Sequence, residues 1–170
     1  MDYTLDQQQD NVLKSSSYAT PFNVDLFGVK PENYFAIYTK IVLSLPESIK
    51  NILMDFSTAE FIEENLGSSF NLTSEQKTEI TRIIRDVLLG DLFIGEMAQS
   101  VSIKAKLDPD EAKKIKDSIV SVLFKPAAED IKKLQTERFP EKINKPIPEK
   151  PDLKIEPDIN RNNVVNLRNK

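Results

Sequence analysis

The most regular hydrophobic pattern in the chain lies between Leu72 and Asp91. Apolar residues recur there every three or four positions, which places them on one face of an α-helix: Ile80, Ile83, Ile84, Val87 and Leu88. Thr73 and Gln76 have the spacing of a capping box, in which each side chain bonds the backbone of the other residue. Gly90 follows as a residue that tolerates the left-handed end of a helix. The pattern therefore predicts a helix over 74–89.

Six further helices are predicted from shorter stripes of the same kind, at about residues 31–45, 46–56, 57–67, 91–104, 109–124 and 127–134. Ser57 with Glu60 has the spacing of another capping box, Gly67 is expected to end that helix, and Asp91 is expected to cap the next. Pro126 separates the last two helices. No stretch alternates as a strand would. The sequence predicts an all-α protein, a compact bundle of about six to seven short helices.

The first of these helices is predicted from an apolar stripe that stops at Pro46: Tyr34, Ile37, Tyr38, Ile41, Val42 and Leu45. Pro31 suits the first turn of a helix, where its missing N–H costs nothing. Because the stripe has helical spacing, we expect it to face the core.

A shift of 35 residues places the region around Leu72 over the region around Leu107. Asp108 and Glu111 then take the places of the two capping residues. The shift aligns Leu72, Ile80, Ile84, Val87 and Leu88 with Leu107, Ile115, Ile119, Val122 and Leu123. Two interpretations stay open: a tandem pair of helical hairpins with a period of 35 residues, or a chance match between two capped amphipathic helices.

The ends of the chain lack such periodicity. Residues 1–24 mix Gln, Asp, Ser and Thr with scattered aromatic residues, a composition typical of a disordered arm. The apolar residues at its end and just after it could still pack loosely against the domain: Phe22, Val24, Leu26 and Phe27. Residues 25–137 contain the predicted helical domain. Prolines interleaved with Lys and Glu predict an extended, solvated linker over 138–160, and a short basic and apolar peptide, 161–170, follows it.

The 170-residue chain contains no cysteine and no histidine. This excludes disulfides, thiolate nucleophiles, Cys- or His-based zinc sites and Ser-His-Asp triads. We therefore expect a protein that is not an enzyme and has no catalytic, cofactor-binding or metal-binding residues.

Three local patterns were weighed as chemical sites. Gly90 and Gly95 have the spacing of a phosphate-binding loop, but Glu96 and Met97 stand where that loop needs Lys and Ser or Thr. The second pattern is the cluster of Asp108, Asp110 and Glu111, and the third is carboxylates one turn apart on a helix: Glu60, Glu63 and Glu64 on one predicted helix, and Glu75 and Glu79 on the next. Helix capping and solvated helix surfaces explain both clusters better than a cation site or acid-base chemistry.

The peptide at the end of the chain is the predicted partner-binding site. Its apolar residues lie next to basic ones, and the residues expected to bind are Val164, Val165, Leu167 and Arg168. A short peptide on a long tether is a common arrangement for docking into another protein. We expect a non-catalytic protein–protein interaction or adaptor module; the alternative for the peptide is an inert tail.

Residues 57–89 suggest an alternative function, because two predicted helices flank a turn as in a helix-turn-helix. A nucleic-acid-associated regulator could use this pair or the tail, since residues 138–170 carry eight basic and five acidic side chains. Glu75 and Glu79 would repel phosphates, however. The basic residues of the pair are Lys77, Arg82 and Arg85. Both arginines can instead pair with acidic neighbours on the same helix.

The pattern predicts no membrane insertion, because no apolar run approaches 18 residues. The first ten residues are polar and acidic, unlike a signal peptide. We expect a cytoplasmic protein. A protein partner is expected, nucleic acid is the weaker alternative, and self-association into a homo-oligomer stays open.

Overall fold

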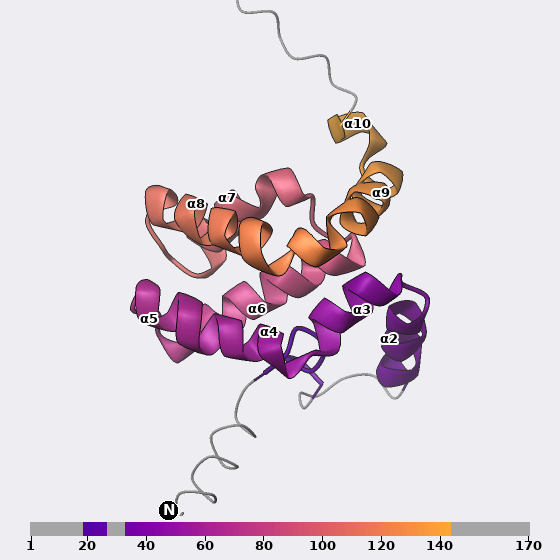
Figure 1. Cartoon of the computed structure of the whole chain (residues 1–170), viewed down its shortest axis with the longest axis horizontal. Helices are drawn as coiled ribbons and strands as arrows, with labels where there is room; N and C mark the ends of the chain where they lie inside the picture. The colour runs from indigo at the N-terminus through magenta and orange to yellow at the C-terminus, as the bar shows by residue number, and fades with distance from the viewer. Residues whose placement is uncertain (1–18, 27–32, 144–170) are drawn as a thin grey trace, which may run out of the picture.

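The computed structural model describes residues 19–26 and 33–143 (Figure 1). These residues form helices and turns, with no strand among them, which confirms the predicted all-α bundle. The predicted C-terminal peptide, most of the predicted linker and residues 1–18 lie outside the described residues.

The helices follow one another with short connections. Their bounds are α2 Tyr34–Leu43, α3 Glu47–Met54, α4 Phe56–Glu60, the π-helix η1 Phe61–Leu66, α5 Gly67–Ser69, α6 Ser74–Leu89, the 3-10 helix η2 Ile94–Glu96, α7 Met97–Lys104, α8 Pro109–Ser118, the π-helix η3 Ile119–Leu123, the 3-10 helix η4 Lys125–Ala127, α9 Ala128–Arg138 and α10 Pro140–Ile143. A helix is present in each of the seven predicted places. The short α10 is additional and lies where the sequence predicted the start of the linker.

Helix α6 occupies the centre of the bundle. It passes between α4 and α5 on one side and α7 and α8 on the other (Figure 1). Seven of its sixteen residues are buried, including all five of the predicted apolar stripe. The capping box is formed as predicted: the Thr73 N–H donates to Gln76 Oε1 at 2.9 Å, and the Gln76 N–H donates to Thr73 Oγ1 at 3.3 Å. Gly90 ends the helix with φ of 75°, also as predicted.

The ends of the preceding helix differ from the prediction. Asp55, and not Ser57 with Glu60, caps its start, because the Ser57 N–H donates to Asp55 Oδ1 at 2.8 Å. Gly67 is not the C-cap: its φ of −54° is helical, and the left-handed residue is Asn71, with φ of 49°. An Asn tolerates this conformation because its short polar side chain can bond the local backbone.

The loop between α6 and α7 also differs, because Asp91 does not cap the next helix, which begins only at Ile94. A buried side chain from α9 holds this loop instead. Gln135 Oε1 accepts the Ile94 N–H at 2.9 Å, and Gln135 Nε2 donates to the carbonyl oxygens of Val87 at 3.2 Å and Leu92 at 3.1 Å. One amide therefore bonds three backbone groups; the Val87 carbonyl also accepts the Gly90 N–H at 3.2 Å, whereas Gln135 is the partner of the Leu92 carbonyl and the Ile94 N–H.

The helix boundaries agree with the 35-residue shift, since α6 begins at Ser74 and α8 at Pro109. Burial agrees at Ile115 and Ile119, which are buried like Ile80 and Ile84. From there η3 is wound as a π-helix, which turns less per residue than an α-helix and so rotates the following side chains. Val122, aligned with buried Val87, is therefore 57% exposed, and Phe124 is buried.

We predict that Gln135→Met lowers the free energy of unfolding by about 1–3 kcal/mol, because the partly buried Ile94 N–H and Leu92 carbonyl lose their partner while the side-chain volume changes little. Urea unfolding followed by circular dichroism measures the loss. The matched control is Gln99→Met on the exposed surface of α7, for which we expect a change within about 0.5 kcal/mol. Equal losses in the two variants would contradict the structural role of Gln135.

Candidate functional site

The first residues that the structure describes are docked on the helical domain. The Phe22 N–H donates to the Leu53 carbonyl at 2.9 Å, and the Tyr38 hydroxyl donates to the Phe22 carbonyl at 3.1 Å. The rings of Phe22 and Tyr38 stack with their centroids 5.4 Å apart. Residues 19–26 thus form a packed segment, part of which the sequence had assigned to the disordered arm of 1–24.

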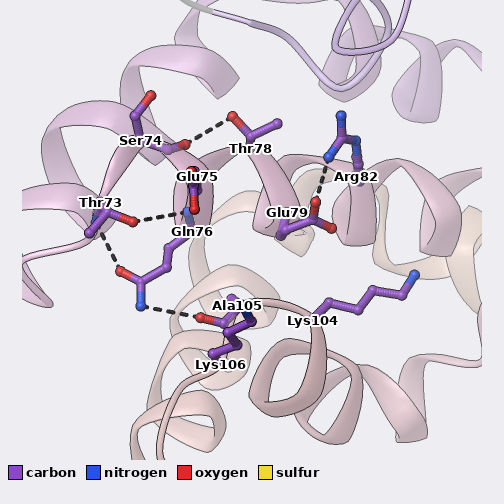
Figure 2. Close-up of a pocket in the computed structure, with 10 residues that line it drawn as sticks. All are labelled: Thr73, Ser74, Glu75, Gln76, Thr78, Glu79, Arg82, Lys104, Ala105 and Lys106. Carbon is purple, nitrogen blue, oxygen red and sulfur yellow. Dashed lines mark hydrogen bonds and ion pairs between the residues drawn. The ribbon is translucent and has the colours of Figure 1, made fainter.

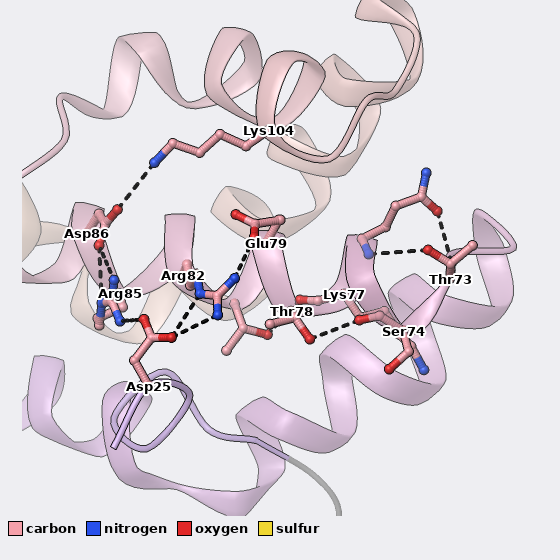
Figure 3. Close-up of polar contacts among 12 residues, drawn as sticks. Asp25, Thr73, Ser74, Lys77, Thr78, Glu79, Arg82, Arg85, Asp86 and Lys104 are labelled. Carbon is pink, nitrogen blue, oxygen red and sulfur yellow. Dashed lines mark hydrogen bonds and ion pairs between the residues drawn. The ribbon is translucent and has the colours of Figure 1, made fainter. Parts of the chain in front are cut away.

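An ion-pair network fixes the same segment to α6 (Figure 3). Asp25 Oδ1 accepts hydrogen bonds from Arg82 Nε at 3.0 Å and Nη2 at 2.8 Å, and Asp25 Oδ2 accepts one from Arg85 Nη1. Arg85 also pairs with Asp86 at 2.9 Å, and Arg82 with Glu79. Both arginines pair with acidic neighbours along the helix, as the sequence suggested, and with an acid far away in the chain.

The network involves the basic residues of the helix-turn-helix-like pair, residues 57–89. Its three basic side chains are engaged by carboxylates, since Lys77 pairs with Glu63 and the arginines with the groups just described. A phosphate would have to compete with these contacts. The arrangement explains the basic residues as structural links between α6 and its neighbours.

A polar pocket of about 420 Å³ lies where the start of α6 meets the end of α7 (Figure 2). Its lining mixes Glu75 and Glu79 with cationic side chains such as Lys104. The helix start is already satisfied by the capping box, and Gln76 Nε2 donates across to the Ala105 carbonyl at 3.2 Å. The pocket therefore lies at a junction between two helices, and the capping residues that line it are engaged in holding that junction together.

The other weighed patterns also have structural roles. Asp108 Oδ1 accepts the Asp110 N–H at 2.9 Å, so the cluster around it caps α8 as expected. Gly90 is a helix end and Gly95 lies in η2, which is not the geometry of a phosphate loop. Among the described residues, no group of three or more acidic side chains is placed to hold a metal ion.

Helix α2 has the largest concentration of exposed apolar side chains in the described part of the chain. Only two of its residues are buried, Tyr38 and Val42. The sequence predicted that Ile37 and Ile41 also face the core. This is wrong: they are 52% and 42% exposed. The helix lies at the edge of the bundle, where other helices cover only one of its sides (Figure 1).

Two more apolar side chains of α2 are exposed, Phe35 at 58% and Leu43 at 63%. Helical spacing places them on the opposite flank of α2 from Ile37 and Ile41, and we call the four exposed side chains together the α2 surface. Its one charged side chain is Lys40. A groove of about 420 Å³ runs beside it, between α2 and the end of α6, and is lined by Ile37, Ile41, Leu89, Asp86 and Asp91, among others.

The sequence contained a signal for this surface. Apolar residues of α2 occur around the whole circumference of the helix, because Phe35 and Leu43 lie off the predicted stripe. A helix that is apolar all round needs contacts on every side. The prediction of the core rested on the stripe alone and therefore did not include the apolar side chains on the other flank of α2, Phe35 and Leu43.

The predicted peptide residues Val164, Val165, Leu167 and Arg168 lie outside the described residues, and nothing in the structure brings them to the α2 surface or separates them from it. Comparisons with protein families, curated proteins and solved structures find no match to this chain. Among the described residues, no helix is both long and apolar enough to cross a bilayer.

Protonation of Asp25 is predicted to weaken the docking of residues 19–26. Burial by itself would raise the pKa of this carboxyl, but hydrogen bonds from Arg82 and Arg85 outweigh burial and lower it. Because the folded pKa is the lower one, the network stabilises the protein above the unfolded value of about 3.9. This contribution is lost as the pH falls through the folded pKa.

Asp25→Asn should therefore cost about 1.5–3 kcal/mol of unfolding free energy at pH 7, and the difference from the wild type should shrink as the pH drops below about 3.9. Urea unfolding at a series of pH values measures both. Asp117→Asn is the control, since Asp117 is 56% exposed and pairs only with Lys116 among the described residues. A pH-independent difference for Asp25→Asn would contradict the network.

Proposed function

We propose that the protein is a non-catalytic protein–protein interaction module whose partner binds the α2 surface. The observation that carries the proposal is the exposure of four large apolar side chains on one ten-residue helix with a single charge. Contiguous exposed apolar patches are uncommon on monomeric proteins and mark interaction sites. Burying such side chains provides the main favourable free energy of association.

A non-catalytic role is supported by the residue types and their use. The chain has no histidine or cysteine to act as base or nucleophile. In the part of the chain that the structure describes, the candidate Asp108 caps α8, and the candidates Glu63 and Glu79 form ion pairs with Lys77 and Arg82. Nucleophile, base and orienting group are not assembled at either pocket described above.

The C-terminal peptide, 161–170, is the second proposed contact with a protein partner. Its residues Val164, Val165, Leu167 and Arg168 would dock on another protein, or on another site of the same one, at the end of the proline-rich tether. The cytoplasmic location expected from the sequence belongs to the same proposal.

The α2 surface is tested by capture of partners from a lysate of the native source with crosslinking. Ile37→Glu with Ile41→Glu places two charges on the α2 surface and replaces only exposed side chains, so the fold should persist. We expect at least tenfold less of each captured protein. Ile103→Glu on α7 is the matched control, because Ile103 is 67% exposed and lies away from α2. A partner list unchanged by the double substitution would contradict the proposal.

A chain that ends after Ile143 tests the peptide in the same experiment, since it retains every described helix. Partners lost from this variant alone belong to the peptide. The nucleic-acid alternative predicts binding to DNA or RNA that weakens steeply with salt. Absence of binding at low salt would exclude it.

A further inference from the structure

A groove of about 330 Å³, which we call the α9 groove, lies between η2, η3 and α9. Most of its lining is apolar: Phe93, Ile94, Val120, Phe124, Ile131 and Ile143. Two polar side chains complete it, and the amide of Gln135 already bonds the backbone around Ile94. Lys132, the other polar residue, is exposed and forms no ion pair with a described carboxylate, whereas its neighbour Lys133 lies 3.7 Å from Asp130.

The chain leaves the described part of the molecule at the wall of this groove. Ile143 is the last described residue, lines the groove and is 42% exposed. Lys142 Nζ lies 2.6 Å from Glu96 Oε1 and stands over the rings of Phe93 and Phe139, 5.5 Å and 5.4 Å from their centroids. These contacts hold α10 against η2, so the residues after Ile143 start at the edge of the groove.

Residues 152–156 have a sequence that complements the groove. An extended chain places Leu153 and Ile155 on the same side, two apolar side chains for one apolar surface. Asp152 and Glu156 flank this pair and give the segment a net negative charge in spite of Lys154. The segment thus offers a carboxylate at either end to the exposed lysine at the rim.

Other apolar residues beyond α10 fit the groove less well. Ile147 and Ile159 each stand alone between polar residues or prolines. The apolar residues of the peptide 161–170 are accompanied only by basic charges, which a lysine at the rim would repel. Charge complementarity therefore favours 152–156 over the peptide as the occupant of the groove.

The length of the connection allows the segment to return to the groove of its own chain. Eight residues, 144–151, separate Ile143 from Asp152 and span at most about 26–29 Å when fully extended. The dipeptide Pro151–Asp152 favours a reverse turn, which a returning chain needs. A short tether holds the segment at an effective concentration on the order of millimolar, so a weak contact is enough to keep the groove occupied.

We propose that residues 152–156 dock in the α9 groove of the same chain, with Leu153 and Ile155 on its apolar lining and a flanking carboxylate at Lys132. The inference goes beyond the proposed function, because it involves neither the α2 surface nor the peptide 161–170. It replaces a fully solvated linker by one that is attached to the domain a second time. The peptide then starts only four residues, 157–160, beyond the docked segment.

The experiment uses the full chain with one engineered cysteine. Because the chain has no cysteine of its own, Lys154→Cys provides a single attachment point for a spin label, between the two apolar residues that dock. A spin label broadens the NMR signals of methyl groups near it. The methyl signals of Ile94 and Ile131 should lose at least half of their intensity, while that of Ile62, in η1 on the other side of α6 (Figure 1), keeps its intensity.

The tether alone keeps the label near the domain, so the decisive comparison is between labelled chains. Leu153→Ser with Ile155→Ser should recover most of the lost intensity, because the segment no longer has apolar side chains to bury. Ile147→Ser with Ile159→Ser is the matched control, since it removes two apolar residues on either side of the segment, and should leave the broadening unchanged. None of these substitutions lies in a described helix, so the fold is not affected.

Charge reversal tests the contact at the rim. Lys132→Glu should weaken the broadening, because like charges then meet, and Asp152→Lys with Glu156→Lys should restore it in that variant. Lys133→Glu is the control, since this side chain is on the same helix and 73% exposed but does not line the groove. Circular dichroism checks that each variant is folded. Broadening that the second reversal fails to restore would overturn the role of Lys132.

Three results would overturn the docking itself. The first is a labelled chain in which the signals of Ile94 and Ile131 keep their intensity. The second is broadening that the two serine substitutions in the segment leave unchanged. The third is broadening of an unlabelled chain mixed with a labelled one, which would mean that the segment docks on a second copy. The capture of partners by the α2 surface is measured separately, so the proposed function stands or fails independently of these results.

Discussion

The bundle depends on the need to cover α6 on more than one side. Seven of its sixteen residues are buried, and helices from earlier and later in the chain pack around it to cover them. Helices α4 and α5 lie along one side and α7 and α8 along the other (Figure 1). The remaining side, with Arg82 and Arg85, is covered by residues 19–26 through Asp25.

Polar side chains complete this packing where helices cannot. Gln135 satisfies the irregular backbone between α6 and α7, and Gln76 joins the start of α6 to the end of α7. Each of these amides provides hydrogen bonds to backbone groups of another element. Each therefore fixes the position of one helix relative to another. Much of the polar chemistry that could suggest a site therefore serves to hold the bundle together.

Helix α2 differs from the helices around α6 because much of its surface has no packing partner among the described residues. It contributes Tyr38 and Val42 to the core and leaves the rest of its apolar surface in water. The one charged side chain of α2, Lys40, forms no ion pair with another described residue, whereas Asp25, Asp86 and the arginines of α6 pair with one another. Among the described helices, α2 is therefore the one whose apolar side chains are least covered by the rest of the fold.

The sequence by itself determined where helices form and how several of them begin and end. The capping box of Thr73 and Gln76 and the left-handed Gly90 are contacts between residues close together in the chain, so their spacing is enough to predict them. Whether a side chain is buried, by contrast, depends on which distant parts of the chain pack over it. Ile37 and Ile41 have the same helical spacing as the buried residues of α6, yet they are exposed because no described element packs over them. The tertiary structure also decided that η3 turns Val122 outward, that Gln135 closes the loop after α6, and that Asp25 reaches Arg82 and Arg85. Each of these contacts joins elements far apart in sequence, and only their packing brings them together.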